Sequence, residues 1–169
     1  APFRRPAELA GDRIGDLEVL LHALKCIEQL DERQYDIIAM LQPTSPFRTP
    51  AQVSACIQML VNNGLDAVWT VSQTDSKGHP LKQLNVGEGS ILKLYDSAGA
   101  QIIARQQLKP VFHRNGIAYV FTRDCLMEQK TILGKRTGAY IVDDCCVNID
   151  TEWDLELAEF MWQRRKYEG

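Results

Sequence analysis

Apolar residues recur every three or four positions in two stretches of the first half of the chain, a spacing that predicts amphipathic helices. The first helix is expected to begin at Asp16, a suitable N-cap, and its apolar stripe consists of Leu17, Leu20, Leu21, Leu24 and Ile27. The second follows Thr49 and Pro50, a cap residue and a proline at the first helical position, and stops at Gly64. Its stripe consists of Val53, Ile57, Leu60 and Val61.

A short apolar run follows each of these helices, at residues 36–41 and 66–71. Continuous apolar runs of this length are typical of strands that are buried on both faces of a parallel sheet. Residues 117–121 and 139–142 predict two more strands, and Thr122 or Arg123 is expected to open a short helix between them. The alternation of helices and strands predicts an α/β fold with a mostly parallel, Rossmann-like sheet flanked by helices.

The periodicity changes between residues 76 and 112, where four glycines separate short apolar stretches such as residues 91–94. Such stretches are typical of hairpins rather than of strand-helix units. We therefore expect one domain over residues 1–169 with an inserted β-rich arm at about residues 76–112.

The last helix is expected to start at Thr151, because residues 151–154 have a pattern similar to a capping box. Its apolar positions predict a buried stripe. That stripe consists of Trp153, Leu157, Phe160 and Met161.

Composition limits the possible functions. With 169 residues, 45% of them hydrophobic, the chain can bury one ordinary core. Lys and Arg total 19 against 22 Asp and Glu, and this net charge of -3 excludes a broad cationic surface for nucleic acid or anionic lipid. The apolar runs are too short to cross a membrane. We therefore expect no nucleic-acid or membrane partner.

The five cysteines are scattered and show no metal-binding or redox CxxC spacing. This usage favours a reducing, cytoplasmic setting. The adjacent pair Cys145 and Cys146 is interpreted as small buried residues.

Three polar segments follow predicted strands or border the arm, and ligands of open α/β sheets bind beyond the strands' carboxyl ends. Residues 42–48 offer an amide, two hydroxyls and a guanidinium, although such a loop could simply cap the next helix. Asn148 and Asp150 lie two apart and could hold Mg²⁺ on one side of an extended segment, or Asp150 could only favour the helix that follows. Residues 105–107 and 114–116 could bind a carboxylate or phosphate, or form a solvated surface.

Six segments taken together resemble the acylneuraminate cytidylyltransferases, also called CMP-N-acetylneuraminic acid synthetases. The resemblance runs through essentially the whole chain, and only the joint occurrence of the segments in the family's order is specific. The segments are RPAELA at 5–10, LQPTSPFR at 41–48, HPLK at 79–82, RQQL at 105–108, RNG at 114–116 and NIDT at 148–151.

The resemblance implies a nucleotide-diphospho-sugar-transferase-like fold and a reaction in which a nonulosonic acid attacks CTP to give a CMP-sugar and pyrophosphate. By resemblance, Arg5 would help recognise cytosine, while Gln42 would contact the sugar and take part in catalysis. Asp150 would bind Mg²⁺ and act in catalysis, with Asn148 as a second metal-facing residue.

The resemblance also implies that the arm crosses to a second subunit of a homodimer. Lys82 and Arg105 of the arm would then complete the sugar site, with Arg105 close to the chemistry, and Asn115 would contact the sugar as well.

Two features depart from the family. The family begins with a strand and a glycine-rich loop that grips the triphosphate, and nothing in these residues matches it, so we expect that segment to be absent and this chain alone to bind CTP poorly. Asn148 stands where the family usually has Asp, which removes one negative charge and should weaken metal binding.

Two alternative functions remain open on sequence. One is a non-catalytic dimerisation or sugar-binding module that has lost the nucleotide loop. The other is a CMP transferase for a related keto-sugar acid such as pseudaminic or legionaminic acid, because sugar substituents are recognised by the shape of the pocket.

Overall fold

The computed structural model describes residues 2–143 and 146–168, so Cys145 lies outside the described residues. Four strands of these residues form one sheet in the order β1-β5-β2-β6. Their bounds are β1 Ile37–Met40, β5 Phe112–Thr122, β2 Ala67–Gln73 and β6 Thr137–Ile141. The strands expected from the apolar runs are therefore all present.

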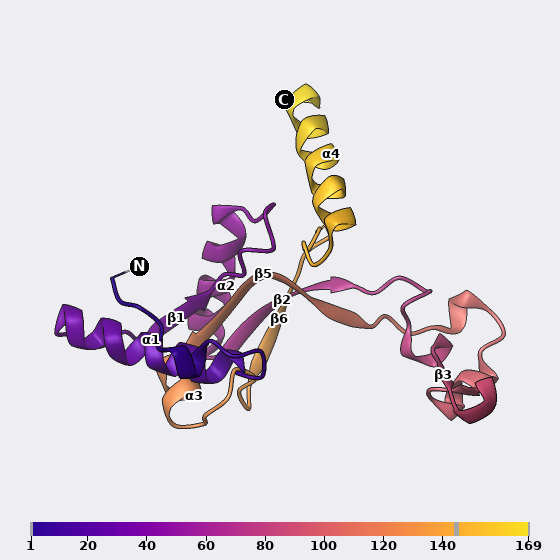
Figure 1. Ribbon diagram of the computed structural model, residues 1–169, viewed down its shortest axis with the longest axis horizontal. Helices are drawn as coiled ribbons and strands as arrows, with labels where there is room; N and C mark the ends of the chain where they lie inside the picture. Colours follow the sequence, from indigo (N-terminus) through magenta and orange to yellow (C-terminus); the bar gives the residue numbers. More distant parts are fainter. Residues whose placement is uncertain (1, 144–145, 169) are drawn as a thin grey trace.

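The sheet is mixed, whereas a mostly parallel sheet was expected. β2 and β6 pair in parallel, but β5 lies between β1 and β2 and is antiparallel to both. The arm explains the difference, because the chain leaves the sheet after β2 and returns from the arm in the opposite direction, as Figure 1 shows. The start of β5 therefore lies toward the end of β1, where Met40 pairs with Tyr119.

Helices cover both faces of this sheet. On one face α2 (Pro50–Asn63) packs against the sheet through Cys56 and Leu60. On the other, α1 (Asp16–Asp31) and α3 (Arg123–Met127) pack through residues such as Leu21 and Leu126. This arrangement confirms the α/β class and gives three layers with a buried sheet in the middle.

The predicted helix ends are largely correct. Thr49 caps α2 in a reciprocal capping box with Gln52, and α2 ends at Gly64, whose φ of 55° is left-handed. Asp16 was expected as the N-cap of α1, but Gly15 holds that position and Asp16 is the first helical residue. Val61 was expected in the buried stripe of α2, yet it is exposed.

β1 was expected to be buried on both faces, but its residues are half-buried and Ala39 is exposed. The reason is its position, because β1 is an edge strand of the described sheet and pairs only with β5.

The arm projects from the body to the right in Figure 1. It contains the predicted hairpin, formed by the antiparallel pair β3 (Leu84–Val86) and β4 (Leu92–Leu94). The short 3-10 helices of the chain are η1 Ala7–Leu9, η2 Pro80–Lys82, η3 Glu88–Ser90, η4 Ser97–Gln101 and η5 Arg105–Gln107.

The last helix, α4 (Glu152–Glu168), projects away from the sheet, as Figure 1 shows. The reciprocal bonds between the Thr151 and Asp154 side chains and backbone amides confirm the predicted capping box. The predicted buried stripe is wrong, since Trp153 is 70% and Phe160 59% exposed. Too little of the sheet lies against α4 to cover its apolar face.

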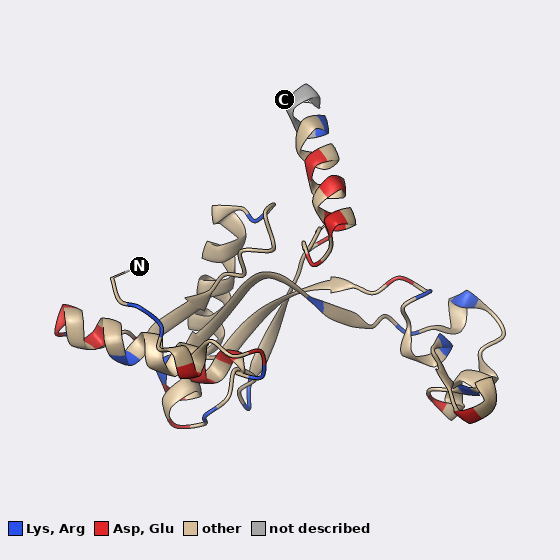
Figure 2. Cartoon of the chain, in the orientation of Figure 1, with Lys and Arg blue, Asp and Glu red and all other residues tan. Residues whose placement is uncertain are grey.

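Charges of both signs are spread over the molecule, and the first turns of α4 carry mainly acidic residues (Figure 2). None of the helices within the described residues is both long and apolar enough to span a membrane.

Candidate functional site

A cavity of about 480 Å³ lies where β1, β5 and the segment before α4 meet. Two long-range contacts bring these segments together, namely the β1–β5 pairing and a 2.8 Å bond from the backbone N–H of Ile149 to the carbonyl of Thr44. The cavity is lined by Asp16, Gln42, Pro43, Thr44, Arg114, Asn115, Gly116, Tyr119, Asn148 and Asp150.

The loop after β1 is held by Arg48, which was expected as a possible ligand-binding cation. Its guanidinium instead donates to the carbonyl of Ile117 at 2.7 Å and to the carbonyl of Gln42 at 2.9 Å. Two bonds from one planar group fix the loop to β5. Arg48 therefore positions Gln42, whose own side chain makes no hydrogen bond within the described residues and is left to bind a ligand.

β5 enters the cavity through a bulge. Its pairing with β2 shifts between Trp69 and Val71, so that residues 115–118 of β5 stand opposite Thr70 alone. The Thr70 hydroxyl stabilises the bulge, because it donates to the carbonyl of Ala118 and accepts from its N–H, both at 2.9 Å. The bulge thus directs Asn115 and the backbone around it toward the site.

Gly116 is required both by its conformation and by the space around it. Its φ is +74°, and a Cβ there would lie 2.4 Å from Ser45 Oγ and 2.6 Å from Gln42 Oε1. Any other residue would be strained and would displace the loop after β1. The glycine therefore permits the close approach of two walls of the cavity.

Asn115 is buried and its side chain serves the bulge. Its amide nitrogen donates to Ser72 Oγ at 3.0 Å, and its amide oxygen accepts from the N–H of Ile117 at 3.2 Å. It lines the cavity, as expected for a ligand-contacting residue, but it is also part of the support for β5.

Asn148 is the centre of a hydrogen-bond network. Its amide oxygen accepts from Thr44 Oγ1 at 2.8 Å and from Ser45 Oγ at 3.2 Å, while its amide nitrogen donates to Asp150 Oδ2 at 2.7 Å. Because a carboxylate only accepts hydrogen bonds, the nitrogen must face Asp150 and the oxygen must face the hydroxyls.

Tyr119 and Arg114 form another wall. Burial raises the pKa of Tyr119 above its usual value of 10, so the phenol stays protonated at neutral pH. The phenol oxygen accepts from the N–H of Gly116 at 3.1 Å, and the Arg114 guanidinium lies 5.5 Å from the Trp69 ring. This wall therefore offers a cation beside an aromatic ring and a neutral phenol.

The donor set fits a hard cation with few protein ligands. The described residues contain no group of three or more His, Cys, Asp and Glu side chains that could cage a metal. The carboxylates of Asp16 and Asp150 both line the cavity, and Mg²⁺ is usually held by one or two carboxylates together with phosphate and water. These residues therefore fit Mg²⁺ that arrives with a phosphate.

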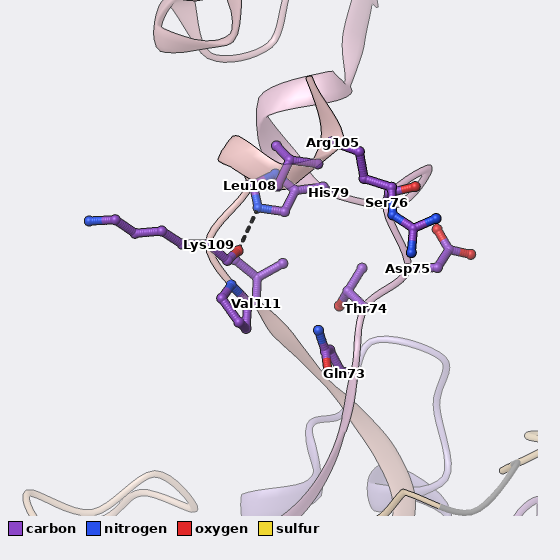
Figure 3. Close-up of a pocket in the computed structure, with 10 residues that line it drawn as sticks. Gln73, Thr74, Asp75, Ser76, His79, Arg105, Leu108, Lys109 and Val111 are labelled. Atoms are coloured by element: carbon purple, nitrogen blue, oxygen red, sulfur yellow. Dashed lines mark hydrogen bonds between the residues drawn. The ribbon is translucent and has the colours of Figure 1, made fainter. Parts of the chain in front are cut away.

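A second cavity, of about 420 Å³, lies at the base of the arm (Figure 3). His79 is buried beside it, and its Nδ1 accepts from the N–H of Leu81 at 3.2 Å. The proton is therefore on Nε2, which donates to the carbonyl of Lys109 at 3.0 Å, the bond dashed in Figure 3. His79 thus joins the two segments that form the base of the arm. On the other side of the cavity, Arg105 reaches toward Asp75 (Figure 3).

The structure brings together four of the predicted site residues and leaves three apart. Gln42, Asn115, Asn148 and Asp150 share the first cavity. Arg105 lines the arm cavity instead, while Lys82 and Arg5 are exposed and line neither cavity.

Sequence reasoning missed two residues that line the first cavity. Asp16 was interpreted only as a helix cap, and Tyr119 only as a strand residue. No local pattern could have identified them, because the antiparallel placement of β5 and the position of α1 bring them to the site.

No family model matches the chain. Curated relatives do match, at low identity over nearly all of its length. The post-translational flagellin modification protein B of Campylobacter coli is 26% identical over 169 residues, 99% of this chain and 70% of that protein. The N-acylneuraminate cytidylyltransferase of Escherichia coli O18:K1:H7 is 26% identical over 95% of this chain but only 37% of its own length.

A third relative, the CMP-N,N'-diacetyllegionaminic acid synthase of Campylobacter jejuni, is 27% identical over 94% of this chain and 66% of its own length. Among solved structures, a CMP:2-keto-3-deoxy-manno-octonic acid synthetase complexed with CTP superposes with a TM-score of 0.60 at 14% identity. That match covers 91% of this chain and 70% of the other, and it shows the fold. Across most of its length, the chain is therefore a distant homologue of the CMP-sugar cytidylyltransferases.

Proposed function

We propose that the protein joins CMP to an acidic keto-sugar of the nonulosonic class. The anomeric hydroxyl of the sugar would attack the α-phosphate of CTP, so that a new P–O bond forms and pyrophosphate leaves. The observation that supports this most directly is the convergence of Gln42, Asn148 and Asp150 on one cavity, from segments that are far apart in the sequence.

Asp150 is the proposed metal-binding residue. Its Oδ2 accepts from Asn148, and within the described residues its other carboxylate oxygen has no hydrogen-bond partner. When bound, Mg²⁺ would offset charge on the phosphates and orient the attacking and leaving oxygens. Asp16 lies in the same cavity and could hold a water of that ion.

Gln42 is the proposed sugar contact. Arg48 fixes its backbone and Gly116 leaves room beside its side chain, so the residue is positioned at the cavity while its amide is left to bind a ligand. An amide can donate to and accept from sugar hydroxyls at once. Asn115, which lines the same cavity, would also contact the sugar. Arg5, in the exposed N-terminal segment, would contact the cytosine.

The arm is proposed to act in a homodimer. It projects from the body and exposes apolar side chains, among them Leu92, Tyr95 and Ile103, which a monomer would leave in water. Lys82 and Arg105 lie on this arm, away from the first cavity, so their proposed role at the sugar carboxylate requires the arm to reach a partner's site. Exchange of the arm between two subunits would meet that requirement.

We propose a reducing, cytoplasmic setting, since Cys26, Cys56 and Cys125 are unpaired thiols. The relatives' names support the reaction class but differ in the sugar, so the proposal names the class. It includes sialic, legionaminic and pseudaminic acids.

The test is pyrophosphate release by the protein expressed from its complete reading frame, with CTP, Mg²⁺ and a panel of nonulosonic acids. At least one acid should give release, and Asp150→Asn should lower kcat by about 100-fold or more, because it removes the charge proposed to hold the ion. Gln42→Ala should mainly raise the KM for the sugar acid. Release that is absent for every acid would refute the proposal.

A further inference from the structure

Asn148 connects the segment before α4 to the loop after β1, and through Ser45 it is also linked to β5. Thr44 and Ser45 belong to the loop after β1, and Asp150 belongs to the segment before α4. Ser45 is buried, and its hydroxyl hydrogen is shared between Asn148 and the carbonyl of Asn115 in β5, which lies 3.1 Å from Oγ. A substitution of Asn148 would therefore alter the hydrogen bonds of both the loop after β1 and Asp150.

The two ends of the Asn148 amide have different tasks. The oxygen accepts the hydroxyl hydrogen of Thr44 at 2.8 Å, and the Ser45 hydroxyl, 3.2 Å away, shares its single hydrogen between this oxygen and the carbonyl of Asn115, so the oxygen faces protein hydroxyls. The nitrogen donates one hydrogen to Asp150 and thereby fixes which carboxylate oxygen remains for a ligand. An aspartate at this position would place an acceptor against an acceptor and repel Asp150.

We infer that Asn148 is a positioning residue: it is not a metal ligand, but holds the Asp150 carboxylate in the orientation that takes the divalent cation. This inference rests on the proposed function, because it takes Asp150 as the metal-binding group. It also accounts for an asparagine at this position. The amide carries no charge of its own, but its hydrogen bond holds the charged carboxylate of Asp150 in place.

The hydroxyl of Thr44 separates this role from direct ligation. Thr44→Val keeps the shape of the side chain and removes the hydrogen bond that holds the Asn148 oxygen. If Asn148 bound the cation through that oxygen, Thr44→Val would free the oxygen and leave binding unchanged or tighter. If Asn148 positions Asp150, the same substitution loosens the amide and weakens binding. Thr44→Ser keeps the hydroxyl and serves as the matched control.

The first measurement is Mn²⁺ binding to the full chain, followed by electron paramagnetic resonance, for wild type, Thr44→Val, Thr44→Ser, Asn148→Ala and Asp150→Ala. We expect Thr44→Val and Asn148→Ala each to weaken binding by about 10-fold or more, as is usual when a partner of a metal ligand is lost. The double variant Thr44→Val with Asn148→Ala should bind Mn²⁺ no more weakly than Asn148→Ala alone, because both substitutions break the same series of hydrogen bonds. Thr44→Ser should bind as wild type does.

Weaker binding in Asn148→Ala with unchanged or tighter binding in Thr44→Val would overturn the inference. Mn²⁺ binding that Asp150→Ala leaves unchanged would overturn it as well, because Asp150 would then not be the metal-binding group that Asn148 positions. Thermal melting of each variant confirms that it is folded.

The second measurement does not depend on the metal. The side-chain amide resonance of Asn148 in a ¹H–¹⁵N spectrum should shift in both Asp150→Ala and Thr44→Val and stay in place in Thr44→Ser. A resonance that moves in neither of the first two variants would overturn the inference. If the spectra and Mn²⁺ binding behave as expected but no sugar acid gives pyrophosphate, the positioning role stands and the proposed reaction fails.

Discussion

At the scale of single residues, the site depends on a glycine that nothing larger can replace. Gly116 has left-handed φ, and a Cβ at this position would clash with Ser45 and Gln42. Gly89 has a similar φ of +66°, but a Cβ there would meet no atom within 4 Å. Comparing alanine substitutions at the two glycines therefore separates the free-energy cost of the left-handed backbone from the cost of the steric clash.

Gly89→Ala is expected to destabilise the protein by about 1 kcal/mol, the cost of left-handed backbone for an L-residue. Gly116→Ala should cost about 1 to 3 kcal/mol more, because the new methyl group displaces buried Ser45. Urea unfolding of the two variants measures the difference. Equal losses would show that the walls of the cavity are not in close contact at Gly116.

Cys56 gives a chemical prediction. Burial of Cys56, on the face of α2 that packs against the sheet, raises the pKa of its thiol from 9.0 to about 11, so that at pH 8 it forms about a hundredfold less thiolate than an ordinary cysteine. Iodoacetamide should modify Cys26 in the folded protein and reach Cys56 only after unfolding. Peptide mass mapping with and without urea checks this, and rapid labelling of Cys56 in the native protein would contradict the packing of α2.

At the scale of elements, α1 and α3 are joined by one ion pair. Arg123 Nε and Nη2 donate to the two carboxylate oxygens of Glu28 at 2.9 and 3.2 Å, and the N–H of Tyr35 donates to the same carboxylate. The bonds from Arg123, followed by the bond from Tyr35, lower the pKa of Glu28 below its usual 4.5.

This shift makes stability depend on pH in a defined direction. A lowered folded-state pKa contributes stability that is fully present above about pH 4.5 and is lost as the pH falls through the lower folded-state pKa. Glu28→Gln should therefore be less stable than wild type at pH 6, and the difference should shrink toward pH 3. Urea unfolding across this range measures it, with Glu18→Gln, on the exposed face of α1, as the control. A difference that is constant with pH would argue against the ion pair.

Most elements could be predicted from sequence, because their signals are local. The cap at Thr49, the stop at Gly64 and the apolar runs of β1 and β2 all appear where expected. The direction of β5 could not be predicted, since the apolar pattern of a strand is the same whichever way it runs. The exposure of α4 could not be predicted for a related reason. An apolar stripe shows that one face of a helix is hydrophobic, but it does not show which part of the molecule packs against that face.

The same limit applies to the site. The motifs predicted that residues around 42, 115, 148 and 150 act together, and in the structure all four line one cavity. That Arg48 and Asn148 bind protein groups could not be predicted, because a guanidinium or an amide in a motif has the same letters whether it holds a ligand or a loop.

At the scale of the whole molecule, the apolar arm predicts association. Leu92, Tyr95 and Ile103 are 60%, 65% and 93% exposed. If the arm packs against a second copy, Leu92→Glu with Tyr95→Glu should raise the dimer Kd by roughly 30-fold or more, the effect of losing about 2 kcal/mol at an interface. Sedimentation velocity over a concentration series measures this. Val61→Glu, an exposed apolar residue on α2, is the control and should leave association unchanged.

A wild-type protein that is monomeric at all concentrations would contradict the dimer. It would also leave Lys82 and Arg105 without a route to the sugar site, since both lie on the arm and away from the first cavity.

The central claim is that the protein forms a bond between CMP and an acidic keto-sugar, and phosphorus NMR of the reaction tests it most directly. With CTP, Mg²⁺ and the nonulosonic acid panel, the protein expressed from its complete reading frame should convert the three phosphate signals of CTP into one phosphodiester signal and an equal amount of pyrophosphate. Asp150→Asn should slow both changes together. Pyrophosphate that accumulates with CMP alone, or CTP that persists with every acid, would contradict the account.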